Sequence, residues 1–108
     1  MSDIYVTIRN QENHALTSID GIAFITLLGQ DGQAIAQETV DLIHADAGFD
    51  DLPIGQYTVV VKHERVVPPA VTYDVTISTN DKVIILIFVY LEPARVLLGI
   101  QASVEKRL

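Results

Sequence analysis

The sequence predicts an all-β protein, a seven-stranded Greek-key β-sandwich formed by a single domain over residues 1–108. Three observations support this prediction. Short segments alternate apolar and polar side chains, and clusters of glycine, proline, asparagine and aspartate separate them. The longest apolar run, residues 83–91, is rich in β-branched residues and is too short to cross a membrane as a helix.

The first half of the chain contains three predicted strands. Residues 3–9 alternate apolar and polar side chains, which is typical of a half-buried strand. Residues 10–20 are polar and are expected to form a loop. Strands are expected near residues 21–28 and 33–41, because Gly29-Gln30-Asp31-Gly32 between them has the composition of a hairpin turn.

The second half of the chain contains the other four predicted strands, of which the last is treated separately below. Residues 42–54 carry an acidic cluster and a turn, and a strand over 56–64 follows. Pro68-Pro69 interrupts pairing before a strand over residues 71–78, and the next strand covers 83–91.

The last segment, residues 95–108, is ambiguous, because its apolar residues fit the spacing of a strand or of a helix. Gly99 and Ser103 weaken the helix, so we expect a seventh strand over about residues 95–105, and this segment is a candidate interface strand.

The turn at residues 49–57, Phe-Asp-Asp-Leu-Pro-Ile-Gly-Gln-Tyr, is the most informative local motif. Pro53 suits the first corner of a turn, and Gly55 is expected to supply a positive φ. Phe49 and Leu52 are expected to fold back as apolar plugs at the end of the core. From Tyr57 onward, valines continue the alternation of a buried strand.

The pattern Phe-x-x-Leu-Pro-x-Gly-x-Tyr followed by valines resembles the transthyretin-like (prealbumin-like) β-sandwich domains. These include the carboxypeptidase regulatory-like domains and the B-type repeats of Gram-positive adhesins. The resemblance covers roughly residues 20–91. It implies a sandwich fold but no particular reaction, because this fold hosts adhesive, regulatory and enzymatic members.

Residues 83–91 are apolar at both odd and even positions, yet only one face of a strand can meet the core of a two-layered sandwich. The other face needs a cover: the segment 95–108, the loop 10–20 or another subunit. We expect the even-numbered residues to form this interface and the C-terminal segment to complete it, with the residues Ile84, Leu86, Phe88, Tyr90, Val96, Leu98 and Ile100.

The composition excludes some classes of partner and of chemistry. The chain has 14 acidic and 7 basic residues, a net charge of −7, which disfavours nucleic acid and anionic lipid as partners. Cysteine is absent, which excludes disulfides and thiolate chemistry. The first residues show no signal-peptide pattern, so we expect cytoplasmic synthesis without secretion by the general pathway.

Candidate chemistry is sparse. His44, Asp46, Asp50 and Asp51 lie close together and are the candidate ligand-binding residues, but their spacing matches no calcium-loop pattern, so no metal or cofactor is expected. His14, His44 and His63 could act as catalytic bases in principle, although His63 is expected to lie at the rim of the core. No Gly-x-Ser-x-Gly motif or phosphate-binding loop occurs, so we predict no enzymatic activity.

The sequence therefore predicts a non-enzymatic structural or interaction module that associates with another protein, most simply with copies of itself. A head-decoration or tail protein of a phage virion is one such assembly component by analogy. The alternative is a module that binds carbohydrate or another small ligand through the loops 42–54 and 65–69.

Overall fold

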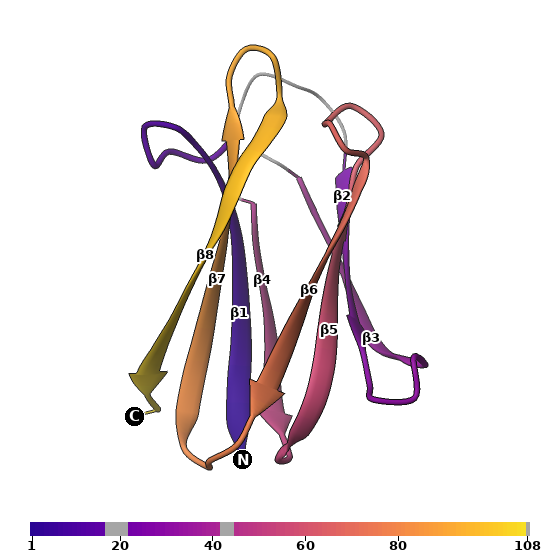
Figure 1. Ribbon diagram of the computed structural model, residues 1–108, viewed down its shortest axis with the longest axis vertical. Helices are drawn as coiled ribbons and strands as arrows, with labels where there is room; N and C mark the ends of the chain where they lie inside the picture. The colour runs from indigo at the N-terminus through magenta and orange to yellow at the C-terminus, as the bar shows by residue number, and fades with distance from the viewer. Residues whose placement is uncertain (17–21, 42–44, 108) are drawn as a thin grey trace.

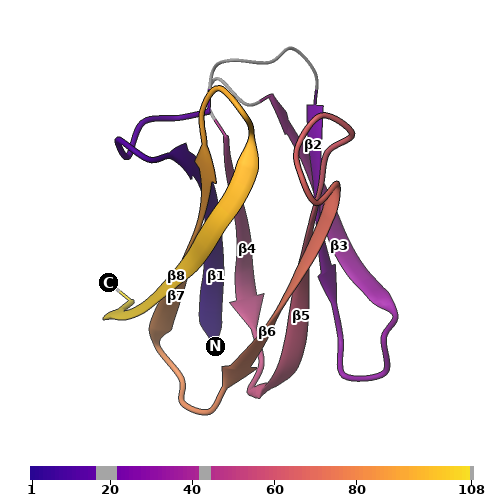
Figure 2. The same ribbon diagram turned by 45° about the horizontal axis from the view of Figure 1, so that its top comes forward.

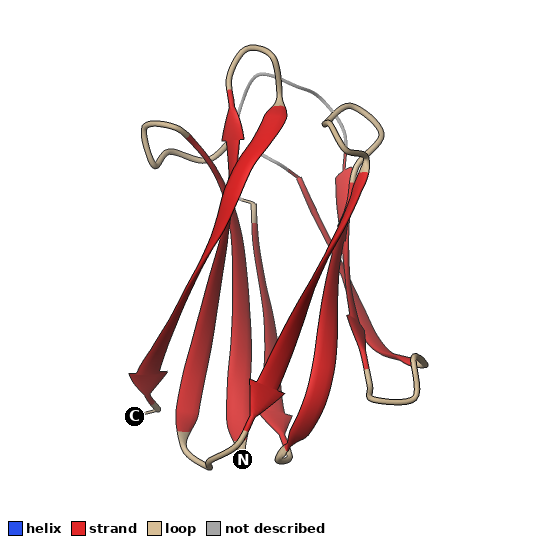
Figure 3. Ribbon diagram, viewed as in Figure 1, coloured by secondary structure: helices blue, strands red, loops and turns tan. Residues whose placement is uncertain are grey.

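The computed structural model describes residues 1–16, 22–41 and 45–107. Within these residues the protein is all-β, with eight strands and no helix (Figure 3). The strands are β1 (Ser2–Asn10), β2 (Ile22–Leu28), β3 (Ala34–Asp41), β4 (Asp46–Leu52), β5 (Gly55–Lys62), β6 (Ala70–Ile77), β7 (Lys82–Leu91) and β8 (Val96–Lys106). The described part of the chain has no helix that is long and apolar enough to cross a membrane.

The strands form two four-stranded sheets that pack face to face, with the orders β4-β1-β7-β8 and β3-β2-β5-β6 (Figure 1). In the first sheet, β1 pairs antiparallel with β4 and parallel with β7, so that Ile4 lies beside Ile84 and Ile8 beside Phe88. The hairpin partner of β7 is β8, which occupies the edge. All pairs in the second sheet are antiparallel.

The core lies between the sheets and follows the alternation that the sequence predicts for most strands. Tyr57, Val59 and Val61 of β5 are buried, as are Val75 and Ile77 of β6. From the opposite sheet, β1 contributes Ile4, Val6 and Ile8, each at most 1% exposed. This two-sided burial of large side chains is the main stabilising contribution to the fold.

The segment 42–54, predicted as an acidic loop and turn, contains an additional strand. Residues 46–52 form β4, which explains why the structure has eight strands rather than seven. Phe49 and Leu52 are buried, which confirms their predicted role as plugs of the core. Aspartate has a poor strand propensity, and this segment contains three aspartates in seven residues, so the sequence pattern did not predict a strand here.

The predicted positive φ at Gly55 is wrong. The left-handed residue of this segment is Asp51, with φ of 59°, which lies within β4 where the pairing with β1 shifts register. Aspartate tolerates this region better than most side chains, and Asp51 N–H donates a hydrogen bond of 3.0 Å to the Asp3 carboxylate. Tyr57 closes the turn by donating its hydroxyl hydrogen to the Pro53 carbonyl oxygen at 2.6 Å.

Candidate interaction surface

The prediction of which face of β7 is free to bind a partner is wrong: the even-numbered face lies in the core and the odd-numbered face points outward. The four even-numbered residues predicted to form an interface are 0–7% exposed and lie in the core: Ile84, Leu86, Phe88 and Tyr90. They cannot dock a partner on the folded domain. The reason is register, because β7 pairs in phase with β1, whose even-numbered side chains are the apolar ones.

A signal for the correct assignment was present in the sequence. The even positions of β7 hold its two aromatic residues, Phe88 and Tyr90, whereas the odd positions hold only Val, Ile and Leu. Aromatic side chains bury the largest area, so the aromatic face is the better candidate for the core.

Among the residues that the structure describes, no segment lies over the outward face of β7, which is the other apolar face of this strand. It presents four half-buried side chains in a row: Val83, Ile85, Ile87 and Val89. Their cross-strand neighbours on β1 include Tyr5, which is 38% exposed, and those on β8 include Ser103. Because each of these residues keeps part of its surface in water, the row forms a continuous apolar stripe on the sheet, called here the β7 stripe.

The C-terminal segment is a strand, as predicted, but it does not cover the β7 stripe. It pairs edge to edge with β7 over its whole length. Of the three residues predicted to complete the interface, Val96 and Leu98 are 40% and 55% exposed, and Ile100 is half-buried. Val104 is 64% exposed although it lies on the core side of the sheet, opposite Ile84.

This exposure follows from the path of β8. The strand follows β7 along its length, and its C-terminal end lies away from β6 (Figures 1 and 2). The opposite sheet therefore gives little cover to the inward side of its second half. A small hollow of about 70 Å³ lies there, and Ile77, Ile84 and Val104 contribute to its wall.

The acidic residues of the segment 42–54 do not converge on a ligand. Asp46 pairs with Arg9 at 3.5 Å, and Asp51 pairs with Arg107, whose Nε also lies 3.3 Å from the Asp3 carboxylate. Asp50 is exposed, and His44 lies outside the described residues. Among the residues with described positions, no cluster of histidines and carboxylates could hold a metal ion.

The other histidines have structural environments. His14 is exposed and lies 3.9 Å from Glu12. His63 is 3% exposed, so it is buried rather than placed at the rim, and its Nδ1 accepts a hydrogen bond of 3.0 Å from the Arg65 backbone N–H. Burial lowers the pKa of His63, which favours the neutral imidazole.

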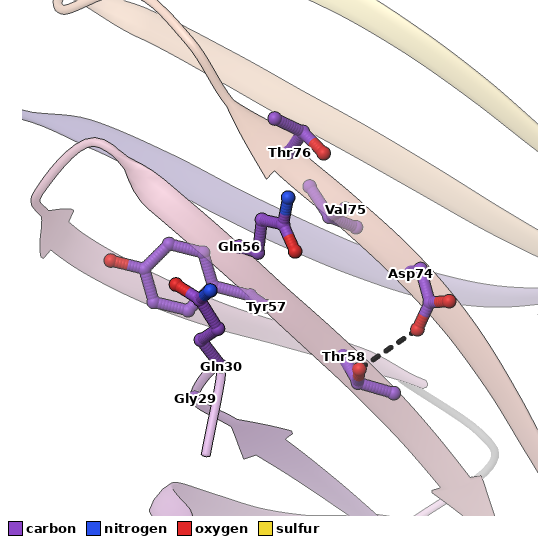
Figure 4. Close-up of a pocket in the computed structure, with 8 residues that line it drawn as sticks. All are labelled: Gly29, Gln30, Gln56, Tyr57, Thr58, Asp74, Val75 and Thr76. Carbon is purple, nitrogen blue, oxygen red and sulfur yellow. Dashed lines mark hydrogen bonds between the residues drawn. The ribbon is translucent and has the colours of Figure 1, made fainter. Parts of the chain in front are cut away.

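A polar hollow of about 310 Å³ lies on the other sheet (Figure 4). Gln56 and Thr58 of β5 and Asp74 and Thr76 of β6 line it, and Gln30 approaches from the turn after β2. The Thr58 hydroxyl donates a hydrogen bond of 2.8 Å to Asp74 Oδ1. The hollow offers amide, hydroxyl and carboxylate groups, and it lies apart from the loops that the sequence analysis selected.

Comparison of the sequence with models of known protein families finds no match. Comparison with curated proteins likewise finds no similar sequence.

Proposed function

We propose that this chain is a non-enzymatic interaction module, a transthyretin-like Greek-key sandwich that self-associates or docks into a larger protein assembly. The observation that carries the proposal is the β7 stripe, which no described segment covers. The fold supports the same class, since two packed sheets of four strands each agree with the sandwich that the turn at residues 49–57 implies.

The size of the surface suits a modest interface. Strands lie about 4.8 Å apart and rise about 3.3 Å per residue, so a patch four strands wide and eight residues long covers roughly 500 Å². Two such patches remove about 1,000 Å² from water, which is the lower limit for a specific interface. Its apolar centre is the β7 stripe, and its rim carries charged pairs such as Arg9–Asp46.

Sedimentation velocity over a range of concentrations tests the proposal. The wild-type protein should sediment as a species larger than 11.9 kDa, and Ile85→Asp should shift it toward the monomer. Val60→Asp is the matched control, because Val60 is a half-buried, outward-facing residue on the central strand β5 of the other sheet. A wild-type protein that stays monomeric to about 100 μM contradicts self-association through the β7 stripe, since a specific apolar interface gives micromolar affinity or better.

A second candidate function is supported by the polar hollow of Figure 4. Its amides, hydroxyls and single carboxylate suit a neutral, hydroxyl-rich ligand such as a carbohydrate. Titration with a panel of saccharides should then shift the NMR signals of Gln56 and Thr76, and Asp74→Asn should weaken binding. Signals that stay unchanged at millimolar saccharide would remove this candidate.

A further inference from the structure

The loop between β5 and β6, residues 63–69, joins the two sheets and is called here the strap. Its base is closed by His63 N–H, which donates to the Pro69 carbonyl at 2.8 Å. Its middle reaches the turn between β7 and β8 of the other sheet, because Val67 N–H donates to the Arg95 carbonyl at 2.9 Å and Leu97 N–H donates to the Val67 carbonyl at 2.8 Å. The strap therefore ties the two sheets together on the side where β6 and β8 are the edge strands.

The side chain of His63 holds the strap in its conformation. It is 3% exposed, and its Nδ1 accepts a hydrogen bond of 3.0 Å from Arg65 N–H. A ring nitrogen accepts a hydrogen bond only when it carries no proton, so this contact requires a neutral imidazole. A protonated ring has a donor at both nitrogens, and the donor at Nδ1 would face the Arg65 N–H. The closed conformation of the strap is therefore compatible with only one charge state of His63.

The surroundings of His63 also oppose a positive charge on the ring. Burial opposes it most; exposed Glu64 favours it, whereas Arg65 of the strap and Arg95 of the β7–β8 turn repel it. The residues of β2 and β6 that pair with the end of β5 are uncharged. Arg95 Nε is itself buried and has no hydrogen-bond partner among the described residues. A second cation beside this guanidinium would therefore be poorly compensated.

We propose that the strap is a pH-controlled switch, in which protonation of His63 releases residues 63–69 from the β7–β8 turn while the two sheets stay folded. Release breaks the hydrogen bond between Arg65 and His63 and the two bonds that Val67 makes to the other sheet. It also uncovers Val66, which is 4% exposed when the strap is closed. The domain thus presents an additional apolar side chain in acidic surroundings. This switch does not depend on the interface proposed for the β7 stripe.

The size of the effect follows from the difference in proton binding between the open and the closed strap. In the open form the imidazole lies in water with its ordinary pKa near 6.5, whereas burial lowers the pKa of His63 in the closed form. Between pH 7.5 and 5.0, the population of the open form relative to the closed form should therefore rise by up to about 30-fold. Above pH 7.5 the ring is neutral in both forms, so the effect disappears.

Amide hydrogen exchange followed by NMR tests the switch at single residues. Protection factors at pH 7.5 and 5.0 are compared, because they exclude the intrinsic pH dependence of exchange. The amides of Val67 and Leu97, which donate the two bonds between the sheets, should lose protection by about fivefold to 30-fold at pH 5.0. The amide of Arg107 donates to the Asp81 carbonyl beyond the other end of β8 and is the internal reference. Its protection should change by less than about twofold if the sheets stay folded.

His63→Asn is the matched variant, because its side-chain oxygen can accept the Arg65 N–H but does not titrate. Its protection at Val67 and Leu97 should be the same at both pH values. Equal losses in wild type and variant, or a parallel loss at Arg107, would overturn the proposal. If His63→Asn does not fold, the wild type alone decides: the loss of protection must follow the titration of the His63 ring signals, and a loss with a different midpoint refutes the switch.

Discussion

Two adjacent isoleucines on β7 provide a direct test of which face of this strand is buried. Ile84 is 7% exposed and points into the core, whereas Ile85 is half-buried on the opposite face. Replacing each by alanine removes the same three carbon atoms and changes the strand propensity equally. The difference in free energy of unfolding between Ile84→Ala and Ile85→Ala therefore measures the difference in burial.

The magnitude follows from these exposures. Three buried carbon atoms contribute about 2.4 kcal/mol, and a residual cavity raises the loss for Ile84→Ala to about 3 kcal/mol. Ile85 already keeps part of its side chain in water and leaves no enclosed cavity, so Ile85→Ala should cost about 1 kcal/mol. With an m-value of about 1.5 kcal/mol/M, the urea midpoints should fall by about 2 M and about 0.7 M.

Urea unfolding of dilute protein, followed by far-ultraviolet circular dichroism, gives both values. Dilution keeps self-association out of the measurement, because it weakens any contribution of an interface at Ile85. Equal losses for the two variants, or a larger loss for Ile85→Ala, would refute the face assignment and the β7 stripe that depends on it.

Two other residues give predictions about stability. Tyr90 Oη is buried and has no hydrogen-bond partner among the described residues. Tyr90→Phe should therefore leave the free energy of unfolding unchanged or raise it by up to about 1 kcal/mol, measured by thermal unfolding; a large drop would reveal a partner for the hydroxyl. Burial raises the pKa of Tyr90 to about 12, above the value near 10 in the unfolded chain, so the wild type should lose stability between pH 10 and about 12 more steeply than Tyr90→Phe. Burial lowers the pKa of His63 below its ordinary value near 6.5, so the stability that the neutral imidazole contributes is present above that pH and is lost as the pH falls. Between pH 7.5 and 5.5, the free energy of unfolding measured in urea should fall more for the wild type than for His63→Gln. Equal falls would contradict a buried, neutral His63.

Strand positions were predictable wherever alternation is clear. The strands expected over 3–9, 56–64 and 71–78 correspond to β1, β5 and β6. Their polar faces fix the register, because a shift by one residue would bury the polar set. The β4 strand escaped prediction because the backbone pairing with β1 overrides the low propensity of its aspartates.

The face of β7 that points into the core was harder to predict, because both of its faces are apolar and alternation does not distinguish them. The parallel pairing with β1 determines which face is buried. This pairing joins residues about 80 positions apart, so a local sequence pattern cannot predict it. The same limit applies to the candidate site. The need for a cover on one face of residues 83–91 was predictable, whereas the choice of face and the path of β8 depend on sheet order.

The parallel pairing of β1 with β7 also affects how the domain is made. During synthesis from the N-terminus, β1 can meet β4 early, but its other side stays open until residues 82–91 have left the ribosome. Until then its main-chain groups and the aliphatic side chains of the half-built sheet are accessible to neighbouring nascent chains. We expect a pause or truncation before residue 82 to leave an aggregation-prone intermediate, since slow, non-local pairing prolongs the time during which wrong partners compete.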